Sequence, residues 1–157
     1  MSQESIELVR RHLEPYDGED IVPVLSEAVD RLGPAPEPEP VLTLWAQDPS
    51  FRHLHPEAVW EIAVGGPLDV KATGPTEITR WWAEWLEVWE SYVYRAVEYR
   101  DSGEWVLSPV DARATGRGGI PVEMRTFEIR SVRDGKVAAT RVFGTEAQAL
   151  EAAGLEE

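Results

Sequence analysis

TEITRWWAEWLEVWE, residues 76–90, is the most informative stretch of the 157-residue chain, because four of the seven tryptophans fall in it. With about 3.6 residues per helical turn, its large apolar side chains share one face: Ile78, Trp81, Trp82, Trp85 and Trp89. Charged side chains occupy the opposite face, and Pro75 suits the first turn of a helix. We therefore expect a helix that presses four indoles against another layer.

That other layer is predicted in the second half of the chain. Strand-forming residues dominate positions 92–100, 104–115, 121–132 and 137–143, and short turns separate these runs. The last turn contains Asp134-Gly135, which favours a tight hairpin. Consecutive strands with short turns are typical of an antiparallel meander, and shorter strands are expected at 58–64 and 68–72.

Two helices are predicted before the strands, at about residues 2–16 and 20–32, because apolar side chains recur there at helical spacing. Residues 33–40, GPAPEPEP, alternate proline with other residues and predict an extended surface connector. A short helix is expected at 148–155. Helices first and strands later predict one α+β domain, residues 1–157, with a curved sheet packed around the helices.

Charge and composition limit the partners. Twenty-nine acidic and fifteen basic residues give a formal net charge of −14. Nucleic acids and anionic membranes both attract clustered Lys and Arg, so neither is an expected partner. The chain has no cysteine and shows neither a signal pattern nor a membrane-length apolar run, so we expect a cytoplasmic protein.

Four stretches together resemble the SnoaL-like branch of the nuclear transport factor 2-like superfamily. They are HPEAVWEIA, the indole-rich helix, EYRDSGEWVL, and VRDGKV with the following FGTEAQALEAAGL. The resemblance covers nearly the whole chain and is least marked at residues 33–50. It implies a cone: a curved antiparallel sheet that wraps around helices and encloses a pocket.

The resemblance also implies a range of functions. The superfamily includes polyketide cyclases, ketosteroid isomerase, limonene epoxide hydrolase, scytalone dehydratase and proteins with no catalytic role, and its members are often dimers. We therefore expect a homodimer through the sheet that binds a small apolar or aromatic molecule. Its activity would be that of a cofactor-independent isomerase, cyclase or hydratase. The alternative is a non-catalytic binding or interaction module whose core is filled by its own side chains.

Candidate catalytic residues lie on two adjacent predicted strands. A hairpin centred near Arg117 would place Asp111 opposite Glu123, with Arg125 diagonal to Asp111. A partly desolvated carboxylate can act as general acid or base, and an arginine can stabilise an oxyanion. The resemblance allows Glu123 or Asp111 to take the place of the strand carboxylate that polyketide cyclases use. The alternative is a solvated ladder of surface ion pairs.

Aromatic residues are the candidate pocket walls: Trp45, Trp60, Trp82 and Trp85. The alternative is that the indoles only fill the core. Glu128 and Arg141 are predicted to form a structural pair on the opposite side of the sheet from Glu123. Which side lines the pocket stays open, because Met124 and Thr126 could also be covered. His53 and His55 lack a third ligand at suitable spacing, so we expect neither a metal nor a cofactor.

Overall fold

The structure is a computed structural model that describes residues 2–30, 51–66 and 68–154. Its helices are α1 (Ser2–Leu13), α2 (Ile21–Asp30), α4 (Gly74–Leu86) and α5 (Glu146–Ala152). Its strands are β1 (Glu19–Asp20), β2 (Leu54–Ala63), β3 (Val70–Thr73), β4 (Trp89–Ala96), β5 (Arg100–Ser102), β6 (Trp105–Gly116), β7 (Pro121–Arg133) and β8 (Lys136–Phe143). The predicted proline-rich connector, 33–40, lies outside the described residues.

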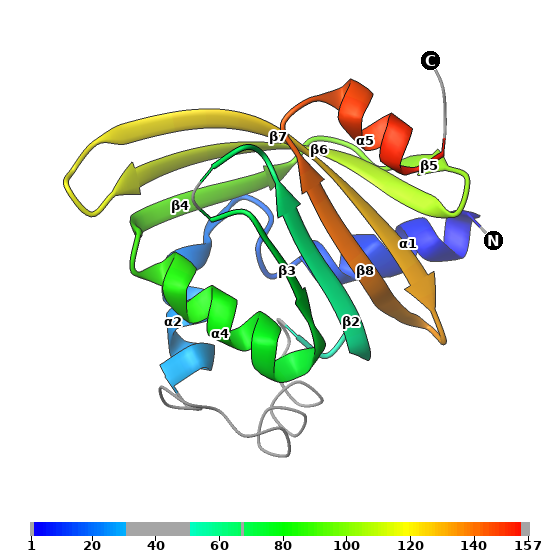
Figure 1. The fold of residues 1–157 in the computed structure, drawn as a ribbon, viewed down its shortest axis with the longest axis horizontal. Helices are drawn as coiled ribbons and strands as arrows, with labels where there is room; N and C mark the ends of the chain where they lie inside the picture. The colour runs from blue at the N-terminus through cyan, green and yellow to red at the C-terminus, as the bar shows by residue number, and fades with distance from the viewer. Residues whose placement is uncertain (1, 31–50, 67, 155–157) are drawn as a thin grey trace.

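The described strands form one curved, eight-stranded sheet in the order β1-β4-β6-β7-β8-β2-β3, with β5 paired to β6 (Figure 1). The antiparallel pairs β6–β7 and β7–β8 confirm the predicted meander. One pair differs, because β2 runs parallel to β8. The sheet is therefore mixed, and the early strand β2 lies beside the last strand of the chain.

The helices divide between the two faces of the sheet. Helices α1, α2 and α4 lie on the inner, concave face, and α5 lies on the outer face (Figure 1). The larger core joins the inner face to α1, α2 and α4, whereas a small second core joins α5 to Leu107, Ile129 and Phe143. This is the predicted α+β cone.

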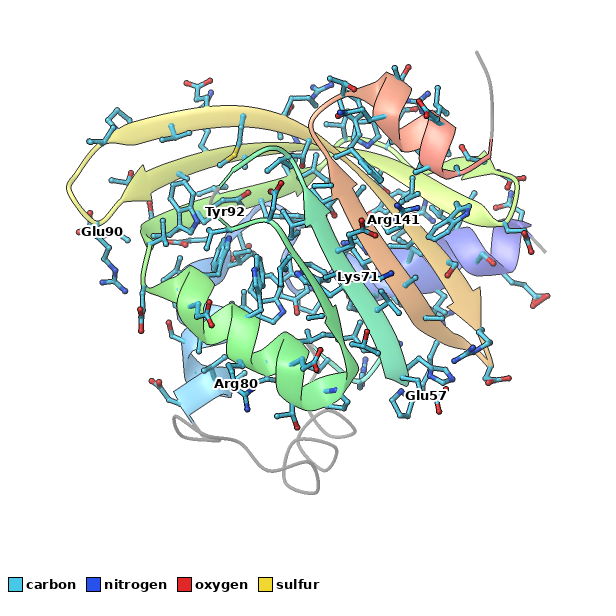
Figure 2. The ribbon with its side chains drawn as sticks, viewed as in Figure 1. Glu57, Lys71, Arg80, Glu90, Tyr92 and Arg141 are labelled. Carbon is cyan, nitrogen blue, oxygen red and sulfur yellow. The ribbon has the colours of Figure 1, made fainter. Side chains whose placement is uncertain are left out.

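Helix α4 confirms the amphipathic pattern but is shorter than predicted. Its polar face carries the exposed Arg80, whereas Tyr92 points from β4 into the space between α4 and the sheet (Figure 2). The helix ends at Leu86, whose carbonyl accepts a bond from Arg117 Nη2 at 2.9 Å. The next residues turn into β4, so the prediction that Trp89 belongs to the helix is wrong. Its indole still packs on Trp85, with ring centroids 6.4 Å apart.

The register of the β6–β7 hairpin differs from the prediction. Asp111 lies opposite Arg125, and Arg113 lies opposite Glu123. The backbone N–H of Gly116 bonds to the carbonyl of Ile120 at 2.9 Å, which centres the turn one residue later than predicted. A shift of one residue in the centre of a hairpin moves every cross-strand partner by two residues.

The predicted pair of Glu128 and Arg141 is also wrong. Glu128 lies opposite Val142, and the Nε of Arg141 donates to Glu61 on β2 at 2.9 Å. The β7–β8 ladder contains a register shift at Ser131/Val132, which displaces the partners that uninterrupted pairing from the turn predicts. Alternation along β7 turns Glu128 to the inner face of the sheet, where Tyr94 Oη donates to it at 2.7 Å.

Candidate functional site

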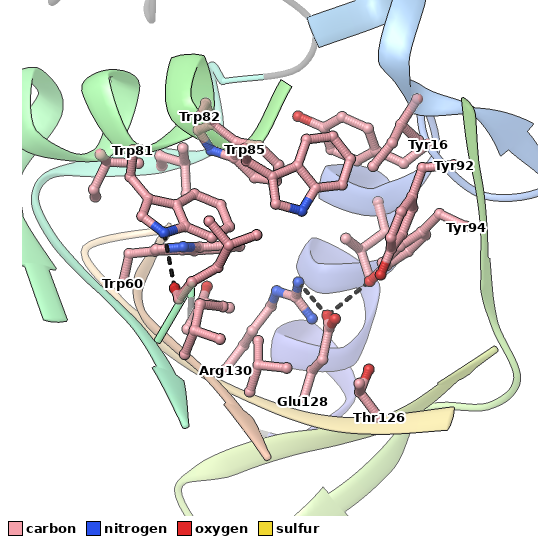
Figure 3. Close-up of a pocket in the computed structure, with 18 of the residues that line it drawn as sticks. Tyr16, Trp60, Trp81, Trp82, Trp85, Tyr92, Tyr94, Thr126, Glu128 and Arg130 are labelled. Carbon is pink, nitrogen blue, oxygen red and sulfur yellow. Dashed lines mark hydrogen bonds and ion pairs between the residues drawn. The ribbon is translucent and has the colours of Figure 1, made fainter. Parts of the chain in front are cut away.

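A cavity of about 170 Å³ lies between α4 and the inner face of the sheet (Figure 3). Aromatic side chains from α4, β2 and β4 form most of its wall: Trp60, Trp81, Trp82, Trp85, Trp89, Tyr92 and Tyr94. An apolar cavity of about 150 Å³ can hold a benzene molecule. The room between the indoles therefore suits a ligand with one or two rings.

The indoles support one another through edge contacts. Trp82 lies at the centre, with ring centroids 5.2 Å from Trp60, 4.9 Å from Trp81 and 5.2 Å from Trp85. The Trp81 and Trp85 contacts are T-shaped, which is a favoured geometry for aromatic pairs. Trp81 Nε1 donates to the carbonyl of Leu68 at 3.1 Å. The wall is thus a packed array of rings, and the bond from Trp81 to Leu68 fixes one of these rings to the backbone.

Polar groups are concentrated on β7, at the sheet side of the cavity (Figure 3). Glu128 Oε1 accepts a bond from Tyr94 Oη at 2.7 Å and another from Arg130 Nη2 at 2.6 Å. The side chains of Glu128 and Arg130 are only 8% and 3% exposed. A buried carboxylate that accepts from one arginine and one tyrosine hydroxyl is the expected arrangement for an ion pair that has left water.

Burial and charge set the protonation of these groups. Burial acts to lower the pKa of Arg130, but the Glu128 carboxylate more than offsets it and leaves the pKa of Arg130 above its ordinary value. Burial raises the pKa of Tyr94 well above its usual range, and Glu128 raises it further. Tyr92 has its pKa raised by the same two causes. Arg130 therefore stays charged, and both tyrosines stay neutral donors at physiological pH.

His12 extends the polar side of the cavity from α1. It is 4% exposed, and its ring lies edge-on to that of Tyr16, with ring centroids 6.2 Å apart. Burial lowers its pKa, and the charge of Arg130 and the neighbouring His53 lower it further. His12 is therefore neutral, and its buried Nδ1 has no hydrogen-bond partner among the residues that the structure describes.

The family model of the SnoaL-like domain matches residues 42–140, more than half of the chain. The protein belongs to this family. A search of curated proteins finds no match.

Solved structures place the SnoaL-like domain in the nuclear transport factor 2-like fold. One similar structure is a protein of unknown function with that fold from Burkholderia pseudomallei, with TM-score 0.61 and 16% identity over 96% of this chain and 97% of that one. A second, from Catenulispora acidiphila, has a ketosteroid isomerase-like fold and a bound trimethylamine, with TM-score 0.54 and 13% identity over 76% and 95%. A third, TerC co-crystallised with polyporic acid, has TM-score 0.57 and 16% identity over 83% and 98%. At these identities the likeness concerns the fold alone.

Three of the four predicted wall residues line the cavity of this SnoaL-like domain: Trp60, Trp82 and Trp85. Trp45 lies outside the described residues. That these indoles bind a ligand stays a prediction. Trp81, Trp89 and Tyr92 line the same cavity but were not among the candidates. Trp81 and Trp89 share the predicted apolar face with Trp82 and Trp85, so their spacing could have identified them.

The predicted catalytic residues Asp111, Glu123 and Arg125 lie outside this cavity, around a shallow depression near the tip of the β6–β7 hairpin. Arg125 donates to both carboxylate oxygens of Asp111, and these bonds hold the pKa of Asp111 below its usual range. The two side chains are 48% and 49% exposed. Asp111 and Arg125 therefore form a solvated surface ion pair, and the carboxylate that lines the cavity is Glu128.

Neither a cluster of metal ligands nor a membrane-spanning helix occurs among the described residues. No group of three or more His, Cys, Asp or Glu among residues 2–30, 51–66 and 68–154 is placed to hold a metal ion. In the same part of the chain, no helix has the length and apolar character that crossing a bilayer requires.

Proposed function

We propose that this SnoaL-like domain binds a small, largely apolar molecule in its cavity and transfers a proton on it without a cofactor, as an isomerase or cyclase does. The observation that supports this function is Glu128, an acid/base group buried at the polar side of an aromatic cavity.

The hydrogen bonds of Glu128 suggest how it would act. Tyr94 and Arg130 both donate to Oε1, so Oε2 is the oxygen available to a substrate. Glu128 would take a proton from a carbon next to a carbonyl, and the electrons of that C–H bond would pass to the carbonyl oxygen as an enolate. The same carboxyl group then returns the proton to a different carbon, which completes an isomerisation.

The cavity walls fit this chemistry. Trp60, Trp82 and Trp85 would hold a flat ring by stacking, with its reactive carbon turned toward β7. Two of the similar structures contain bound molecules, polyporic acid and trimethylamine. They support small-molecule binding by analogy of fold, and they do not identify the substrate of this chain.

Exchange of carbon-bound hydrogen in D₂O tests the proposal directly. A panel of small aryl ketones is incubated with the protein, and deuterium uptake next to the carbonyl is followed by NMR. We expect Glu128→Gln to lower the catalysed rate by at least about 100-fold, the usual contribution of general acid–base catalysis. Circular dichroism checks that the variant folds.

Glu123→Gln is the matched control, because it makes the same change on the outer face of the same strand. Its exchange rate should equal that of the wild type. Loss of exchange in Glu123→Gln or Asp111→Asn, with Glu128→Gln unaffected, would move the active site to the hairpin depression. No exchange with any ketone by the wild type would contradict the catalytic proposal.

A second candidate function is non-catalytic binding, which the small volume of the cavity favours. It predicts quenching of indole fluorescence by small aromatic molecules without any deuterium uptake.

We also propose that two copies pair through the sheet, and sedimentation velocity at increasing protein concentration measures this. A single monomer peak at all concentrations would contradict the dimer.

A further inference from the structure

The cavity contains buried nitrogen atoms that have no partner in the described structure. They are Nε and Nη1 of Arg130, Nε1 of Trp60, Nε1 of Trp89 and Nδ1 of His12. All four residues line the cavity. Buried donors that lack an acceptor are costly, and an arginine is the costliest of them because it is charged.

The guanidinium of Arg130 is only partly used. Its plane carries five N–H groups, and Glu128 is bonded through Nη2 alone. The side chain is 3% exposed, so solvent does not replace the missing acceptors. By contrast, Arg125 on the outer face meets both oxygens of Asp111 and is half exposed.

His12 lies near the guanidinium of Arg130, whose Nε and Nη1 lack an acceptor in the described structure. It belongs to α1, whereas Arg130 belongs to β7, and the charge of Arg130 is close enough to contribute to the lowered pKa of His12. One positive group and one neutral imidazole, both with unpaired nitrogens, thus border the same cavity. An oxygen atom with negative charge is the chemical group that could accept from both.

We propose that the ligand of this cavity is an acid, whose aromatic or alicyclic body lies among the indoles while its anionic oxygen accepts hydrogen bonds from Arg130 and His12. Carboxylates, enolates, phenolates and sulfonates share this chemistry. The inference rests on the proposed function only in that it takes the cavity as the place where the ligand binds. It does not depend on proton transfer. It also explains why Glu128 alone does not complete the hydrogen bonding of Arg130.

Two probes of the same size and shape test the head group. 4-Methylbenzenesulfonate keeps its negative charge at all accessible pH values, and 4-methylbenzenesulfonamide is neutral. Calorimetry on the full chain should show the sulfonate binding about tenfold more tightly than the sulfonamide, the usual effect of a charge-assisted hydrogen bond. Equal affinities, or no binding of either probe, would overturn the inference.

Two matched variants locate the anion. Arg130→Lys keeps a positive charge beside Glu128, so the fold is retained, but it removes the planar set of donors. It should reduce the preference for the sulfonate to about twofold. Arg125→Lys makes the same change on the outer face and should leave the preference unchanged. An equal loss in both variants would show that the sulfonate binds the surface, and would overturn the inference.

His12→Phe and Glu128→Gln complete the test. His12→Phe keeps an aromatic ring and should weaken only the sulfonate, whereas equal weakening of both probes would contradict a role for the imidazole in reading the anion. Glu128→Gln should bind the sulfonate at least as tightly as the wild type, because a negative charge is removed. If Glu128→Gln still catalyses deuterium exchange, the proposed catalysis fails while the anion site stands.

Discussion

Strand β7 carries the same short pattern twice, and the two copies have opposite environments. Glu123-Met124-Arg125 and Glu128-Ile129-Arg130 are offset by an odd number of residues, so the pleat turns their charges to different faces. On the outer face, Arg125 bonds to Asp111 of β6 and remains 48% exposed. On the inner face, Arg130 bonds to Glu128 of its own strand and is 3% exposed.

The difference shows that residue type alone does not make a site. An exposed ion pair is screened by water and contributes little to stability. A buried pair has lost its hydration, so each partner depends on the other and on every additional hydrogen bond. The inner copy holds its carboxylate and guanidinium away from solvent, beside the aromatic cavity.

The largest predicted effect comes from removing one member of the inner pair. Arg130→Met leaves Glu128 buried without its counter-charge and should lower the free energy of unfolding by about 3–5 kcal/mol. Urea denaturation followed by circular dichroism measures this. Arg125→Met is the outer counterpart and should leave the denaturation midpoint unchanged within error.

The pairing itself can be separated from the cost of a lone charge. The double variant Glu128→Leu with Arg130→Met replaces both charges by apolar groups, so it should recover most of the stability that Arg130→Met loses. A double variant as unstable as the single one would mean that packing, and not charge, explains the loss.

The second effect concerns the hydroxyl that completes the inner pair. Tyr94→Phe removes the 2.7 Å bond to Glu128 and should cost about 1–2 kcal/mol of unfolding free energy. Tyr99→Phe is the control, because the guanidinium of Arg10 lies over the ring of Tyr99, 5.1 Å from its centroid, and this contact does not use the hydroxyl. The same urea denaturation compares them, and equal losses would contradict a special role for the Tyr94 hydroxyl.

The third effect is a pH dependence from His12. The ordinary pKa of histidine is 6.5, and burial lowers the pKa of His12 in the folded protein. Below pH 6.5 the unfolded chain binds a proton that the folded protein does not, so stability falls as pH decreases toward the lowered pKa. The slope contributed by this one group is at most about 1.4 kcal/mol per pH unit.

His12→Phe tests that slope by comparing denaturation midpoints from pH 7.5 down to about 5.5, above the range in which ordinary carboxylates titrate. The pKa of His53 is lowered as well, chiefly by burial and then by Arg52, so part of the slope should persist in the variant. An unchanged slope in His12→Phe would show that His12 does not titrate as inferred.

The smallest effect is expected on the outer face. Arg125 lowers the pKa of Asp111, so whatever this pair contributes is present above the ordinary pKa of 3.8 and is lost as pH falls through the lowered value. At neutral pH and physiological salt, Asp111→Asn should not measurably change the denaturation midpoint. A clear loss would show that the outer pair does more than ordinary surface ion pairs do.

Much of the fold follows from local patterns. The indole spacing predicts α4 because Ile78, Trp81 and Trp85 must share a buried face, and all three are buried. Asp134 and Gly135 both adopt positive φ, 55° and 71°, as the hairpin signal predicts. The short turns predict that β6, β7 and β8 are neighbours, and they are.

The candidate site was harder to predict, because it depends on long-range geometry. Glu123 and Glu128 look alike in the sequence, and the packing of α1, α2 and α4 on one face of the sheet decides which of them is covered. The turn at Gly116–Ile120 moved the partner of Asp111 by two residues, which no propensity reveals. The parallel pairing of β2 with β8 joins segments far apart in the chain, and no turn motif in the sequence predicts it.

The β2–β8 pairing limits how far the chain can fold while it is still being synthesised on the ribosome. Strand β2 leaves the exit tunnel well before β8, the partner that covers its second edge and the last of the described strands. Strand β2 thus keeps one open edge through most of translation, and an open edge can pair with a neighbouring nascent chain. Folding should therefore be limited by the pairing of β8 with β2, and a chain truncated before β8 should aggregate.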